Sequence, residues 1–134
     1  MDLFKDEEHL DSMLGGMSPS LNLLAIFCRD VNDKWWRDPV TKEPITRNDG
    51  ELLMLMVSEI SEAMEAHRKN AMDDKLPHRK GLEVELVDCL IRIFDYAGEH
   101  KLDLTGAFNE KIKYNLVRKD HSFEERVKPG GKKY

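Results

Sequence analysis

Two pairs of acidic residues, each with a three-residue spacing, are the part of the sequence best suited to chemistry. Glu59 and Glu62 form the first pair, in SEISEAMEAH at 58–67, and Glu85 and Asp88 form the second, in EVELVDC at 83–89. Positions i and i+3 share one face of an α-helix, so like charges there repel each other by a few tenths of a kcal/mol. A divalent cation removes that cost, because hard cations bind carboxylate oxygens. The two pairs therefore predict a site for one or two such ions.

Both pairs fall in segments with helical periodicity, expected at about 49–70 and 81–100. On the wheel of 49–70, Glu59 and Glu62 border an apolar arc, while Glu51 and Glu65 lie opposite; the arc consists of Leu53, Met56, Ile60, Ala63 and Met64. The segment 81–100 is apolar on most sides and keeps one polar strip: Gly81, Glu85, Asp88, Arg92, Asp95 and Glu99. Carboxylates close to a core need a compensating cation. The alternative is that they are surface charges, or partners of Arg92 and nearby lysines.

The rest of the chain completes an expected all-α fold, a four-to-five-helix bundle, because no segment alternates with a period of two. Ser18 and Pro19 predict the start of a first helix that reaches about Trp36, Asn48 caps the second helix, and Asp103 caps a fourth that reaches about Asp120. The predicted organisation is an acidic N-terminal arm at 1–17, a helical domain at 18–120 and a C-terminal tail at 121–134.

Composition argues against two classes of partner. The 134 residues carry a formal net charge of -5, which disfavours a nucleic-acid binder. No apolar run approaches the ~18 residues of a membrane span, and the first residues lack the order of a signal peptide. Cys28 and Cys89 sit in apolar helical patterns and are expected to be buried thiols of a reducing compartment. These observations predict a cytoplasmic protein.

The acidic pairs also carry a resemblance. Glu59-Ile60-Ser61-Glu62, a 22-residue gap and Glu85-Leu86-Val87-Asp88 resemble the ExxE–ExxD signature of all-α nucleoside triphosphate pyrophosphatases, and more narrowly the MazG-like proteins, including small phage-encoded ones. The similarity runs from about residue 48 to 121 and includes DKLPHRKG and EKIKYNLVRKDH.

This resemblance implies Mg²⁺-dependent hydrolysis of a (deoxy)nucleoside triphosphate to monophosphate and pyrophosphate, with dGTP and GTP as the favoured substrates and Mn²⁺ as a substitute ion. It implies that the four acids, Glu59, Glu62, Glu85 and Asp88, are the metal ligands and catalytic residues. It also implies a homodimer or homotetramer. The apolar perimeter of 81–100 independently predicts an oligomer.

A triphosphate needs further cations, and the sequence offers several candidates for contacts with substrate: Lys111, Asn115, Arg118, Lys75, Arg79 and Trp35. The first three recur at i, i+4 and i+7 on the fourth helix, and the resemblance matches Lys111 and Asn115 to a conserved Lys and Asn of the family. The loop at 75–80 could hold outer phosphates, and Trp35 or Trp36 could stack on a base. The alternatives are an exposed helix end, a solvated turn and a core anchor.

Three other functions are consistent with parts of this pattern. A non-catalytic helical interaction module could bind a divalent ion for structure alone, and a sequential diphosphohydrolase could act on the same nucleotides. A di-iron bundle would need Glu-x-x-His pairs. None of the five histidines has a glutamate three residues before it, so an oxygen-only site is favoured over di-iron.

Overall fold

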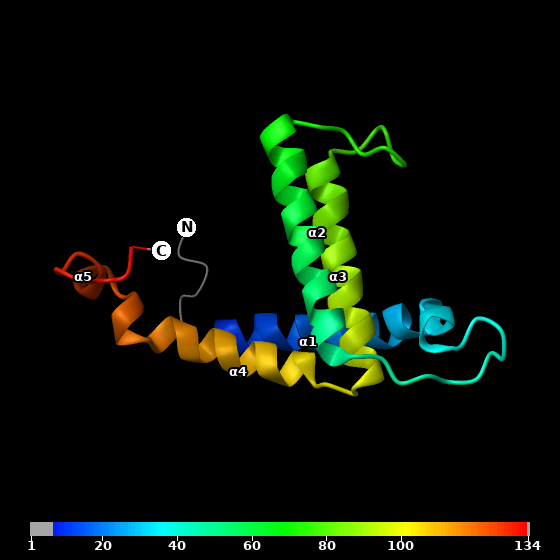
Figure 1. Ribbon diagram of the computed structural model, residues 1–134. Helices are drawn as coiled ribbons and strands as arrows, with labels where there is room; N and C mark the ends of the chain where they lie inside the picture. Colours follow the sequence, from blue (N-terminus) through cyan, green and yellow to red (C-terminus); the bar gives the residue numbers. More distant parts are fainter. Residues whose placement is uncertain (1–6, 134) are drawn as a thin grey trace. The chain divides into compact units, whose positions relative to one another are not determined.

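The computed structural model describes residues 7–133, except for the side chains of residues 7 and 17–19, and all its regular elements are helices (Figure 1). Residues 1–6 of the expected arm and residue 134 of the expected tail lie outside the described residues. The helices are α1 (Glu7–Val31), α2 (Asp49–Lys69), α3 (Gly81–Glu99), α4 (Leu104–Val117) and α5 (Phe123–Arg126), with 3₁₀ turns at Asp33–Trp36 and Lys119–His121. The all-α class is therefore confirmed. No described helix is both long enough and apolar enough to cross a bilayer.

The chain divides into two compact units. One unit is Asn22–Leu102, which contains the second half of α1 with α2 and α3, and the other is formed by the described residues on either side of it. The division into arm, domain and tail stays a prediction. The acidic pairs both belong to the unit at Asn22–Leu102.

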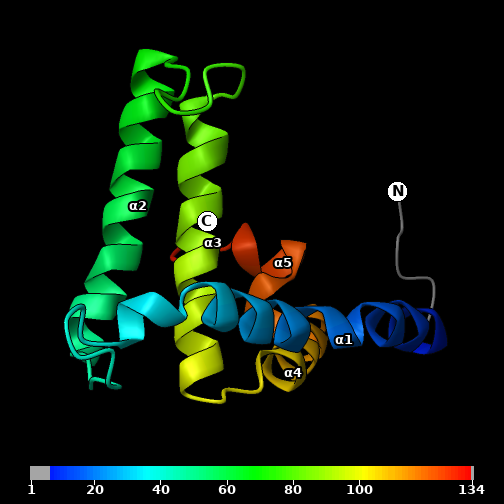
Figure 2. The same cartoon turned by 90° about the vertical axis from the view of Figure 1, so that its right-hand side faces the viewer.

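α2 and α3 form an antiparallel hairpin, and they lie side by side in both views (Figures 1 and 2). Asn48 begins α2 by accepting a hydrogen bond from the backbone N–H of Glu51 at 3.0 Å. Asn70 ends α2 in the left-handed conformation, with a φ of 49°. In the loop that follows, Met72 and Lys80 form an isolated antiparallel β-bridge. The predicted helices at 49–70 and 81–100 are confirmed.

The hairpin closes on a different side of α2 from the one the sequence predicts. Leu52, Glu59 and Ala63 are buried, whereas three members of the predicted arc are exposed: Leu53 at 48%, Ile60 at 49% and Met64 at 68%. On α3, Leu86, Val87 and Leu90 are exposed as well. One neighbouring helix covers only one side of each helix, so the apolar perimeter exceeds what the hairpin buries within the chain. The predicted arc is therefore wrong for those three residues of α2.

The first helix begins earlier than predicted. α1 is continuous from Glu7, through Gly15, Gly16 and Pro19, where the sequence predicts a helix start at 18–19. An interior glycine costs about 1 kcal/mol and a proline about 3 kcal/mol in a helix. Leu10 and Leu14 are 8% and 4% exposed, and their burial offsets part of that cost. Tertiary contacts have overridden the local stop signals.

The second half of α1 packs against the C-terminal end of α3. Gly98 makes this possible, because a Cβ at that position would lie 2.4 Å from the backbone oxygen of Ala25. Arg29 of α1 forms ion pairs with Glu99 and, at 3.0 Å, with Asp33. This contact fixes the 3₁₀ turn that follows α1 beside α3, and that turn carries the two tryptophans.

Candidate metal centre

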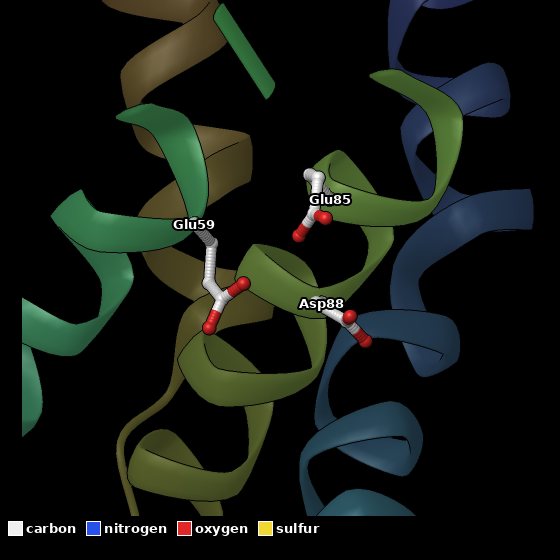
Figure 3. A group of neighbouring side chains, drawn as sticks. All are labelled: Glu59, Glu85 and Asp88. Carbon is white, nitrogen blue, oxygen red and sulfur yellow. The ribbon is translucent and has the colours of Figure 1, made fainter. Parts of the chain in front are cut away.

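Three of the four predicted acids come together on the α2–α3 hairpin. Glu59 projects from α2, and Glu85 and Asp88 project from one turn of α3, three residues apart (Figure 3). Each offers one carboxylate oxygen, and these oxygens all lie within 4.8 Å of one another. We call these three residues the acidic triad. It is an oxygen-only donor set of the kind that hard divalent cations bind.

Glu59 is the most buried member of the triad and it has a cation partner. It is 7% exposed, and its Oε1 accepts a hydrogen bond from Nε of Arg92 at 2.6 Å. Arg92 lies on α3 one turn after Asp88, so the contact crosses the hairpin. A buried carboxylate without a partner would be costly, and this guanidinium removes most of that cost. The alternative, that Glu59 is a partner of Arg92, is confirmed by this ion pair.

The other two acids of the triad are perturbed by their surroundings. Burial raises the pKa of Glu85 to about 7, and the hydrogen bond to Glu59 and the nearby negative charges of Glu62, Glu59 and Asp88 act in the same direction. Burial also raises the pKa of Asp88, and the charge of Glu59 adds to the effect, while Arg92 opposes it. Raised carboxyl pKa values in one cluster indicate a position where negative charge is held at a cost, as at many functional sites.

Glu62 and a fifth acid border the triad. A cleft of about 530 Å³ runs from the triad to the loop after α2, and we call it the loop cleft; its lining includes Glu62, Asp73, Lys75, Glu85 and Asp88. Glu62 is exposed and does not belong to the triad. Asp73 is 9% exposed and accepts backbone hydrogen bonds from Lys75 and Leu76, which shapes the loop. By contrast, Glu65 pairs with Arg68 of its own helix, and Glu83 pairs with Arg79 of the loop before α3. Neither acid lines the loop cleft.

A second cleft, of about 430 Å³, shares Arg92 with the loop cleft, and we call it the Trp35 cleft. Glu59, Asp88 and Arg92 line both clefts, whereas Glu85 lines the loop cleft alone. The remaining lining of the Trp35 cleft includes Asn32, Trp35, Arg47 and Asp95. A volume of this size falls within the range of small-molecule sites.

The two tryptophans have different roles. Trp36 is 4% exposed, and its Nε1 donates to Oδ1 of Asp95 at 3.0 Å, which makes it the core anchor that the sequence expected for one of the pair. Trp35 is 61% exposed and lines the cleft, with Lys34 Nζ 5.3 Å from its ring centroid. Trp35 is thus free to stack on a planar ligand.

The cations predicted in the loop differ in their placement. Lys75 lines the loop cleft, but it is 82% exposed and pairs with its neighbour Asp74 at 2.5 Å. Arg79 pairs with Glu83 at 3.7 Å and lines neither cleft. The prediction for Arg79 as a contact beside the acids gains no support from this arrangement.

The three candidates near the C-terminal end belong to the other unit. α4 ends at Val117, so Arg118 follows the helix in an extended conformation and does not continue the predicted helical stripe. Lys111 and Arg118 both lie over the ring of Tyr114, at 5.1 and 5.5 Å from its centroid. Oδ1 of Asn115 is buried and has no hydrogen-bond partner among the residues that the structure describes. Their contact with substrate stays a prediction.

Several residues that line the clefts were not selected from the sequence. Arg92 and Asp95 are on the polar strip of α3, and their spacing of four and seven residues from Asp88 was a usable signal. Asn32 and Arg47 lie in or beside loops without periodicity, so nothing in the sequence marks them. The only sequence signal for Asp73 is its position next to a turn.

Comparison of the chain with protein-family models, with curated proteins and with solved structures finds no match. The class that fold and site define is an all-α protein with an acidic cluster that could hold a metal ion.

Proposed function

We propose that this chain is a cytoplasmic, Mg²⁺-dependent nucleoside triphosphate pyrophosphohydrolase of the MazG-like type, with Mn²⁺ as a substitute ion and a preference for dGTP and GTP. The observation that carries the proposal is the acidic triad. Two acids on one turn of α3 and one on α2 converge within 4.8 Å, in the order that the ExxE–ExxD resemblance implies. The raised pKa values of Glu85 and Asp88 also support the proposal, because a divalent ion would offset the repulsion between these carboxylates.

Within the proposed reaction, the residues of the chain bind and orient. Glu59, Glu85 and Asp88 would hold the ion, and Glu62 at the edge of the loop cleft would be the fourth ligand or would accept the proton of the attacking water. An ion held there would supply Lewis-acid chemistry toward the phosphates and the attacking water. Trp35 would stack on the base in the adjoining cleft.

The proposed enzyme acts as a homodimer or homotetramer. The apolar side chains that the hairpin leaves exposed on α2 and α3 support this: Leu53, Val57, Ile60, Met64, Leu86 and Leu90. A two-helix hairpin buries one side of each helix, and a second copy would cover more of the apolar area. Lys111, Asn115 and Arg118 are kept as proposed contacts with the substrate.

The test is a hydrolysis assay with a panel of nucleotides in ¹⁸O-labelled water. We expect pyrophosphate release that a chelator abolishes and that Mg²⁺ or Mn²⁺ restores, with the label in the nucleoside monophosphate. Label only in inorganic phosphate would mean attack at the γ position and would favour a sequential diphosphohydrolase. Metal binding without any hydrolysis would favour the non-catalytic interaction module.

A further inference from the structure

The Trp35 cleft is lined by two arginines whose terminal nitrogens form no ion pair within residues 7–133. Arg92 donates to Glu59 through Nε, and it makes no other ion pair among residues 7–133. Arg47, in the loop before α2, lies with its Cζ 5.3 Å from the ring centroid of Trp36 and forms no ion pair within the described part of the chain. The terminal nitrogens of both side chains are therefore available to a ligand in this cleft.

Arginine is suited to one kind of ligand in particular. Its planar fork donates two parallel hydrogen bonds to a phosphate, and these charge-assisted bonds are about twice as strong as neutral ones. The cleft is also lined by the carboxylates of Glu59, Asp88 and Asp95, which would repel a free phosphate. A divalent ion on the triad reverses that repulsion, so the cleft becomes a place for a phosphate chain that also contacts the ion.

We propose that Arg47 and Arg92 are the phosphate-binding pair of this protein, and that they hold the diphosphate or triphosphate group of the ligand beside the acidic triad. This inference rests on the proposed function, since it takes the triad as the site of the ion. It assigns phosphate binding to two residues other than the loop and α4 cations that the sequence suggested. Lys75 forms an ion pair with Asp74, and Arg79 forms one with Glu83.

Arg92 has a second role that follows from its geometry. Its Nε donates to one oxygen of Glu59, and its terminal nitrogens form no ion pair among residues 7–133. The side chain therefore links the position of an ion ligand to the position of a phosphate. Arg47 forms no ion pair with the triad among the described residues, so its proposed role is phosphate binding alone. The two residues should consequently be separable by experiment.

The experiment measures the binding of inorganic pyrophosphate in Mg²⁺ buffer, and the binding of Mn²⁺ alone, by titration calorimetry on the full chain. The variants are Arg47→Gln, Arg47→Lys, Arg92→Lys and, as control, Arg68→Gln. Arg68 is exposed on α2, pairs with Glu65 and lines neither cleft. Circular dichroism checks that each variant keeps its helices, and Arg47→Lys retains the charge if the glutamine variant does not fold.

We expect Arg47→Gln to weaken pyrophosphate binding at least tenfold while its Mn²⁺ affinity stays within twofold of wild type. Arg92→Lys should weaken pyrophosphate binding at least fivefold through loss of the fork, and Arg47→Lys should be intermediate. Arg68→Gln should match wild type. Pyrophosphate affinity within twofold of wild type in both Arg47→Gln and Arg92→Lys would overturn the inference. So would a parallel loss of Mn²⁺ binding in Arg47→Gln, because Arg47 would then support the ion site instead.

The outcomes distinguish this inference from the proposed function. If wild type binds pyrophosphate in an arginine-dependent way but hydrolyses no nucleotide, the phosphate pair stands and the enzymatic assignment fails. If wild type hydrolyses nucleotides and Arg47→Gln has an unchanged KM, the assignment stands and the phosphate pair fails.

Discussion

Replacing Glu85 by glutamine is expected to stabilise the metal-free protein at pH 8, although it removes a proposed metal ligand. Burial, the hydrogen bond to Glu59 and nearby negative charges raise the pKa of Glu85 to about 7, from 4.5. A pKa that is higher in the folded state gives stability that is fully present below pH 4.5 and is lost as the pH rises through about 7. At pH 8 the wild type therefore folds against the cost of ionising this carboxyl. The amide of the variant does not ionise.

The size of the effect follows from the two pKa values. A pKa of about 7 against an ordinary 4.5 corresponds to about 3 kcal/mol of unfolding free energy at pH 8. Glu85 is only half-buried, so solvent screening reduces this to about 1–2 kcal/mol. For a chain of 134 residues, 1 kcal/mol moves the Tm by about 3–6 °C. We expect Glu85→Gln to unfold about 3–10 °C higher than wild type at pH 8 in chelator, and to lose most of that advantage at pH 5.

Thermal unfolding followed by circular dichroism measures this directly. Glu83→Gln is the matched control, because Glu83 is an exposed acid on the same helix and lies outside both clefts. It should give no rise in Tm. Added Mg²⁺ should then raise the Tm of the wild type more than that of Glu85→Gln, so that the difference in Tm shrinks or changes sign. A Tm for Glu85→Gln equal to or below that of wild type at pH 8 in chelator would refute the reasoning about the triad.

Other substitutions test the site, the helix contact and the assembly. Asp88→Asn should lower hydrolysis by at least a hundredfold with helicity unchanged, whereas Glu65→Gln should stay within twofold of wild type in the same assay. Gly98→Ala should lower the unfolding free energy by about 1–3 kcal/mol in a denaturant titration, because its Cβ would lie 2.4 Å from the oxygen of Ala25; an unchanged midpoint would contradict that close contact. Leu90→Glu, at an exposed apolar position, should dissociate the proposed oligomer in sedimentation, and a wild type that is already monomeric at micromolar concentration would remove the assembly from the proposal.

The hairpin could be predicted from the sequence because its signals are local. Asn48 caps α2, and Gly81 begins α3, as expected. The start of α1 could not be predicted, because Gly15 and Gly16 disfavour a helix interior and Ser18-Pro19 is a typical helix start. What overrides them is the burial of Leu10 and Leu14, which depends on segments distant in the sequence.

The candidate site shows the same division between local and distant information. Helical spacing predicted that Glu59, Glu85 and Asp88 could meet, and they do. The wheel could not show which side of α2 faces α3, so it placed Ile60 in the core and left Glu59 at its border, whereas the structure buries Glu59. Arg47 could not be found at all, because a loop has no periodicity and its approach to the cleft depends on the tertiary fold.

The Arg92–Glu59 pair bears on how such a site can exist before an ion binds. Three ionised carboxylates on a two-helix hairpin would repel each other, and the ionisation of Glu85 adds to that repulsion. Arg92 offsets one negative charge at Glu59, and the raised pKa of Glu85 keeps a second charge partly neutral near pH 7. The hairpin can therefore fold without the ion while keeping an oxygen-rich cluster for it. An ion that binds would displace the proton of Glu85, and the guanidinium that remains would already lie beside the cleft in which we place the phosphates.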